Sequence, residues 1–183
     1  MTATTVKGIE ITNIEASPIT PLDRKSYDNE LKVSIAKLEV ATTSIDETAD
    51  VMLLCPIPSH AIVDGVYIKN DDLDSHACPT LAVDIGLYYS GKGTKQVLEG
   101  RASGDEINVD GFASAVTTLQ AANVTWQEVT NEALNIDNYA TEAWSGPGGL
   151  SADPGGFFYI GAKVTTVAAT AAAGGFIMKV EYR

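Results

Sequence analysis

The segments GFFYIGAKVTTV (156–167) and GGFIMKVEY (174–182) decide the fold class of this 183-residue chain. Both are rich in β-branched and aromatic residues, and both have the length of a strand. The residues between them, AATAAA (168–173), are small and too few for an independent helix. We therefore predict a terminal β-hairpin with a small-residue connection.

The same strand character recurs upstream. Residues 80–88 place Leu81, Val83, Ile85 and Leu87 on one face of a strand. Residues 51–55 (VMLLC) form a short apolar run that Pro56 and Pro58 end, and residues 61–68 (AIVDGVYI) form the next strand.

The segment LKVSIAKLEV (31–40) also reads as a strand, but its apolar residues change parity. Leu31, Val33 and Ile35 share one parity, whereas Leu38 and Val40 share the other. A bulge or twist near residues 36–37 would explain the change.

The remaining central residues carry weaker signals. Residues 111–123 mix helical spacing with Val and Thr, so we expect a short helix or irregular crossover there. Residues 146–156 (GPGGLSADPGG) read as a loop. The strand count predicts an all-β protein, a β-sandwich of about seven or eight strands, over residues 30–183 with a loop-rich insertion around 91–155.

Residues 1–29 read as an extended N-terminal arm. Ile9-Glu10-Ile11 alternates, and Pro18 and Pro21 interrupt the segment. Because the arm cannot form a core of its own, we expect it to lie on the body or on a neighbour. The residues proposed to contact a partner are Ile9, Ile11, Ile14, Pro18 and Pro21.

Charge excludes several classes of partner. The chain has 12 Lys and Arg against 24 Asp and Glu, a formal net charge of −12 that would repel a phosphate backbone, so we expect no nucleic-acid binding. No apolar run reaches the roughly 20 residues that cross a bilayer, and the start lacks a secretory signal. We expect synthesis in a cytoplasm, no membrane contact, and buried free thiols at Cys55 and Cys78.

One segment imitates a phosphate-binding loop. GLYYSGKG (86–93) approaches G-x-x-x-x-G-K-[ST], but Gly93 stands where a hydroxyl must hold magnesium. The residues that follow reach Gly100 too soon for the required helix. We interpret the segment as a strand that leaves its sheet into a turn.

Other candidate chemistry is equally sparse. Cys55, His60, His76 and Cys78 lack zinc-ligand spacing, and the acidic turn 70–74 lacks the glycine and distal glutamate of a calcium loop. We therefore predict no catalytic residues, no metal and no cofactor. A hydrolase with a carboxylate pair stays open because two acids can meet from anywhere in a sequence.

Three aromatic residues suit a different function. Trp126, Trp144 and Tyr159 fall in the last third of the chain and would form a sugar-binding platform if exposed. Core packing is the commoner use of such residues. A platform of this kind would make the chain a carbohydrate-binding module.

Three features of the body follow a known pattern: the apolar run with Ile-Pro and a Gly-containing strand (51–70), the strand ending in Asp-x-Gly (80–86), and the closing Lys-Val-Glu-Tyr strand (179–182). In these features the body resembles the cement, or head-stabilising, decoration proteins of tailed bacteriophage capsids.

This resemblance implies a jelly-roll-like sandwich and a non-enzymatic structural protein of the virion. By this resemblance the protein would lie on the capsid exterior, bind the major capsid protein and stabilise contacts between capsid subunits. It would be a homo-oligomer, which we expect to be a trimer. The alternative function is a carbohydrate-binding virion or adhesin module.

Overall fold

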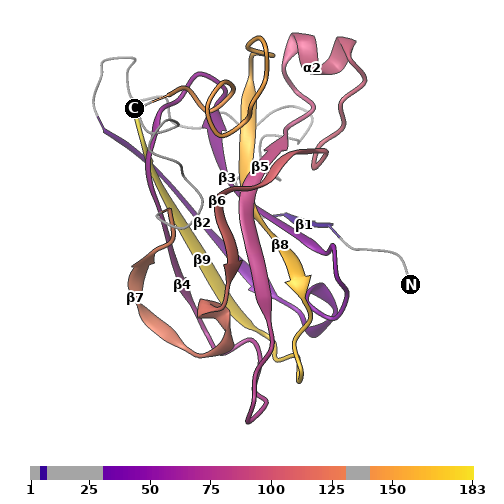
Figure 1. The fold of residues 1–183 in the computed structure, drawn as a ribbon, viewed down its shortest axis with the longest axis vertical. Helices are drawn as coiled ribbons and strands as arrows, with labels where there is room; N and C mark the ends of the chain where they lie inside the picture. Colours follow the sequence, from indigo (N-terminus) through magenta and orange to yellow (C-terminus); the bar gives the residue numbers. More distant parts are fainter. Residues whose placement is uncertain (1–4, 8–30, 131–140) are drawn as a thin grey trace.

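Residues 5–7, 31–130 and 141–183 are described by the computed structural model (Figure 1). Two sheets face each other across one core, which confirms the predicted all-β sandwich. The strands are β1 (Thr5–Lys7), β2 (Lys32–Val40), β3 (Val51–Pro58), β4 (Val63–Asn70), β5 (Ala82–Tyr89), β6 (Glu106–Val116), β7 (Asn123–Glu128), β8 (Phe157–Thr166) and β9 (Gly174–Tyr182). Short helical turns occur at η1 (Thr42–Ser44), α2 (Thr94–Leu98) and η2 (Thr118–Gln120).

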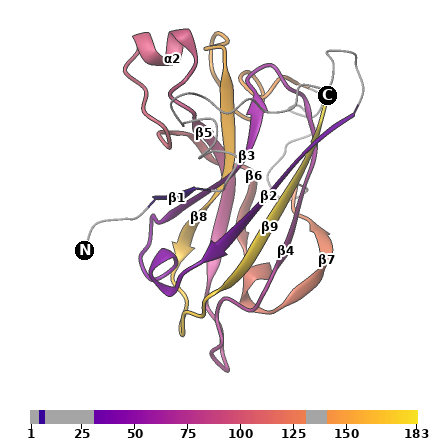
Figure 2. The same cartoon turned by 180° about the vertical axis from the view of Figure 1, so that it is seen from behind.

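The order of the strands is that of a jelly roll. The four-stranded sheet runs β2-β9-β4-β7, and the five-stranded sheet runs β1-β3-β8-β5-β6. Strands β2 to β9 thus form two facing sets of four, and the chain changes sheet at most of its connections. β1 is an addition to this plan, since it pairs in parallel with the edge of β3 (Figure 2).

The predicted terminal hairpin is wrong. Both strands exist, but β8 pairs with β3 and β5, whereas β9 pairs with β2 and β4 in the opposite sheet. The small-residue connection therefore crosses between sheets instead of turning within one. Local strand signals cannot distinguish these cases, because partner choice depends on strands far away in the sequence.

The predicted bulge near Ala36 is also wrong. β2 pairs with β9 in unbroken register from Lys32 opposite Tyr182 to Val40 opposite Gly174. Ala36, Leu38 and Val40 face the core, whereas Val33 and Ile35 face outward and are half exposed. The change of parity therefore records apolar residues on both faces of a regular strand.

The expectation of a helix or crossover over residues 111–123 is wrong for its first half. Gly111 to Val116 belong to β6, and only the turn η2 after them is helical. β6 pairs with β5 through three register shifts, so its side chains do not alternate regularly. Within the predicted loop-rich region 91–155, β6 and β7 each complete one sheet.

A buried carboxylate joins two of the connections between sheets. Asp74, in the β4–β5 connection, is 1% exposed. Its Oδ2 accepts the backbone N–H groups of Thr80 (2.7 Å), Leu81 (3.0 Å) and Ala169 (3.0 Å), and its Oδ1 accepts that of Thr170 (2.9 Å). Burial by itself raises the pKa of Asp74, but the backbone donors together outweigh it and hold that pKa well below its ordinary value.

Replacing this carboxylate should destabilise the fold in a pH-dependent way. Asp74→Ala leaves four backbone N–H groups without their acceptor, and we expect it to lower the free energy of unfolding by about 3 kcal/mol at pH 7. Since the folded-state pKa is depressed, the carboxylate stabilises fully above its unfolded pKa of about 4 and loses that effect as pH falls further.

Urea unfolding measured between pH 7 and pH 2.5 checks this expectation. The gap between the wild type and Asp74→Ala should narrow below about pH 4. Asp46→Ala, at an exposed loop position, is the matched control and should change stability by less than about 0.5 kcal/mol. A gap of constant size across the whole pH range would contradict the assignment.

Candidate interaction surface

The two sheets differ in what covers their outward faces. On the five-stranded sheet, Val51, Leu53, Tyr88 and Tyr159 form a second apolar cluster that is buried although it lies outside the main core. Burial and the nearby acids Glu106 and Asp84 raise the pKa of Tyr88. The outward face of the five-stranded sheet thus buries its central apolar side chains, whereas the four-stranded sheet leaves outward apolar side chains exposed.

An apolar row lies along the edge strand of the four-stranded sheet. Leu31 is 58% exposed, and Val33 and Ile35 are each 50% exposed. Val33 and Ile35 share the outward face of β2, which pairs with β9 on one side, and Leu31 directly precedes the strand. An exposed apolar row on an edge strand is a feature of interaction surfaces.

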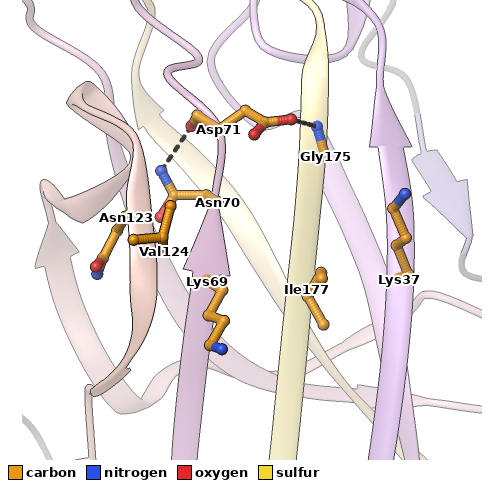
Figure 3. A pocket seen from close by; sticks show the side chains of 8 residues that line it. All are labelled: Lys37, Lys69, Asn70, Asp71, Asn123, Val124, Gly175 and Ile177. Carbon is orange, nitrogen blue, oxygen red and sulfur yellow. Dashed lines mark hydrogen bonds between the residues drawn. The ribbon is translucent and has the colours of Figure 1, made fainter.

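A row of charged and apolar side chains crosses the same face at right angles to the strands. Ile177 on β9 lies opposite Lys37 on β2 and opposite Lys69 on β4, so the register places one lysine on each side of it (Figure 3). These side chains line a groove of about 300 Å³ together with Val124, Gly175 and Asp71.

One end of the groove is fixed by backbone contacts. Asp71 accepts the backbone N–H of Gly175 through Oδ2 at 2.7 Å, and its own N–H bonds to the carbonyl oxygen of Gly175 at 2.9 Å. Its carboxylate is thus committed to holding β4 against β9. Glu39 forms an ion pair with Lys37, and the hydrogen bond between them raises the pKa of the Lys37 ammonium group.

Trp126 on β7 lies beside two lysines of this outward face. The ammonium of Lys69 lies 4.7 Å from the centre of its ring, and that of Lys179 lies 5.3 Å away. Lys179 also lies 4.0 Å from the Tyr67 ring and 2.7 Å from Glu181 Oε1. Cation–π contacts of this kind favour positions of the two ammonium groups close to the Trp126 ring.

The residues predicted to contact a partner through the arm lie outside the described part of the chain; they are Ile9, Ile11, Ile14, Pro18 and Pro21. From the arm, Thr5–Lys7 are described, and they form β1 beside β3.

The cysteines and histidines do not converge. Cys55 is buried with Sγ 3.4 Å from the carbonyl oxygen of Met178, whereas Cys78 is exposed, so the expectation of two buried thiols is wrong for Cys78. The ring of His76 contacts the backbone of Cys78 instead of sharing a ligand with its thiol. In the described ranges, no three His, Cys, Asp or Glu side chains are placed to hold one metal ion.

The loop that imitated a phosphate site is closed by a buried glutamine. Gln96 in α2 accepts from Ser90 Oγ (3.1 Å) and the Gly91 N–H (3.0 Å), and donates to the carbonyl oxygens of Gly155 (2.7 Å) and Phe157 (3.2 Å). A Cβ on Gly93 would lie 2.3 Å from the Gly155 oxygen. The glycine serves close backbone packing, in agreement with our interpretation of this segment as a turn.

Within the described residues, no helix is long and apolar enough to cross a membrane.

The three aromatics proposed as a sugar platform lie in different settings. Tyr159 is fully buried and cannot stack on a sugar. Trp144 is partly buried against the core and donates its indole N–H to Glu142 at 2.6 Å. Trp126 is the exposed member, at 37%, and it is already flanked by lysines.

Sequence reasoning missed this outward face, although one signal pointed to it. The parity change in residues 31–40 arises because apolar residues lie on both sides of one regular strand, whereas we interpreted it as a bulge or twist. The lysines around Ile177 gave no signal, since their proximity depends on pairing between three strands.

No protein-family model and no curated protein matches this chain. Among solved structures, it is similar to a chain in the "Cyanophage Pam1 capsid asymmetric unit", with 22% identity and a TM-score of 0.55, over 88% of this chain and 90% of that one. It is also similar to a chain in the "Capsid of Ralstonia phage GP4", with 19% identity and a TM-score of 0.59, over 98% and 97% of the two chains. The resemblance to phage head proteins is thus confirmed at the level of the fold.

Substitutions on the outward face of β2 should leave stability unchanged. We expect the double change Val33→Thr and Ile35→Thr to alter the free energy of unfolding by less than about 0.5 kcal/mol per site, because both side chains face outward. Leu38→Ala, on the inward face of the same strand, should cost about 2–5 kcal/mol. Thermal and urea unfolding measure both, and equal losses would show that the outward row is packed.

Proposed function

We propose that this protein is a structural component of a phage virion that binds the outside of the capsid. In this function it stabilises contacts between major capsid subunits as a cement protein and carries out no reaction. The observation that carries the proposal is the jelly roll that it shares, over most of both chains, with chains of two phage capsids.

The surface of the body supports a binding function over a catalytic one. The exposed row Leu31, Val33 and Ile35 offers apolar area for a partner, and a groove that opens to the protein surface lies on the same sheet. The buried Asp74 carboxylate is occupied by backbone N–H groups of two connections, and so it is not available as an acid or base. The buried amide of Gln96, which is neither an acid nor a base, holds a loop in place.

Charge supports an exterior position. A net charge of −12 per copy opposes contact with a packaged genome and, repeated over a shell, keeps particles apart. Synthesis in the host cytoplasm and assembly as a homo-oligomer, a trimer in the simplest case, complete the proposal.

The arm is the second part of the proposed contact. Its isoleucines Ile9, Ile11 and Ile14 would lie on a neighbouring capsid subunit, with Pro18 and Pro21 keeping the chain extended. Since apolar contacts are little affected by salt, an interface formed by the arm would persist at high ionic strength.

Binding to heads that lack this protein tests the function. The full chain, mixed with purified heads from a phage genome deleted for its gene, should co-sediment with them and raise the temperature at which they release DNA. The triple change Ile9→Ser, Ile11→Ser and Ile14→Ser should weaken binding at least tenfold while circular dichroism stays unchanged.

Two results would count against parts of this proposal. Absence of the wild-type chain from the sedimented heads at any salt concentration would reject the cement function. Full binding by the triple variant would remove the arm from the interface and leave the sheet face to carry it.

A further inference from the structure

The groove on the four-stranded sheet has the geometry of a carboxylate site. Lys37 and Lys69 lie on strands two positions apart, and both are in register with Ile177 between them. With about 4.8 Å between neighbouring strands, their backbones are about 10 Å apart. In Figure 3 the two lysines flank Ile177, with the Lys37 ammonium toward Asp71 and the Lys69 ammonium away from it, so both flexible side chains turn toward Ile177 to reach one ligand above it.

Among the lysines that line the groove, Lys69 is the one without an acidic partner in the described residues. Its ammonium lies over the Trp126 ring, and no carboxylate in the described part of the chain forms an ion pair with it. A cation–π contact leaves the ammonium free to donate hydrogen bonds on its outer side.

The neighbouring charges do not fill this position. Asp71 accepts the Gly175 N–H, and Glu181 pairs with Lys179. Glu39 pairs with Lys37, but both side chains are more than half exposed, and such surface pairs are weak and readily exchanged.

We propose that this groove receives a carboxylate side chain of the major capsid subunit, held between Lys37 and Lys69. Apolar side chains beside that carboxylate then pack on Ile35 and Val33, which continue the surface along β2. This inference rests on the proposed function and adds the chemistry of the partner: an acidic residue flanked by apolar ones. The ion pairs fix the position of the bound capsid subunit, and the apolar row supplies the surface area that is buried on binding.

Neutral substitutions of the lysines test the proposal. Lys37→Met and Lys69→Met keep the aliphatic stems and remove the charge. Together they should weaken binding to heads lacking this protein by about tenfold at low salt, and should flatten its dependence on ionic strength. Lys92→Met, at an exposed loop position after β5, is the matched control and should bind like the wild type.

The possible outcomes distinguish a failure of the carboxylate site from a failure of the proposed cement function. The carboxylate site is wrong if the double methionine variant binds with wild-type affinity and salt dependence while the Val33→Thr and Ile35→Thr variant loses binding. That pair of results would leave the cement function intact. Failure of the wild type to bind heads would reject the function itself. If light scattering instead shows that the double variant loses self-association while head binding is unchanged, the groove receives a second copy of this chain, and the inference is wrong.

Discussion

The Asp74 carboxylate is the contact on which the arrangement of the sandwich most depends. A jelly roll sends its chain repeatedly between two sheets, so its connections carry backbone groups that no strand satisfies. Asp74 collects four such N–H groups from the β4–β5 and β8–β9 connections into one buried site. It thereby fixes where β9 enters the four-stranded sheet, and the groove follows from that placement.

The outward face of the four-stranded sheet is a consequence of register. Once β9 starts opposite Val40, every odd-numbered position of β2 is paired with an outward position of β9. Lys37 then lies opposite Ile177, and the pairing of β4 with β9 brings Lys69 to the other side. A shift of one residue in either ladder would turn these side chains into the core and bring apolar ones out, so the core pattern also enforces the surface pattern.

Strand identities could be read locally, whereas partners could not. Alternation in 80–88 and the apolar run at 51–55 located β5 and β3, because burial of one or both faces leaves a direct trace in the residue pattern. β6 escaped because register shifts against β5 destroy its alternation. The hairpin assigned to β8 and β9 failed because two good strands joined by a short connection look the same whether they pair or cross.

The sequence by itself determined the all-β class, most of the strand-forming segments and the acidic composition, since these depend on local patterns and on counting. It also excluded the phosphate loop, through Gly93 and the nearness of Gly100. Tertiary structure alone decided which outward apolar side chains stay exposed, which lysines flank Ile177, and what Asp74 and Gln96 hold. Each of these depends on residues far apart in the chain, brought together by strand pairing that no local pattern encodes.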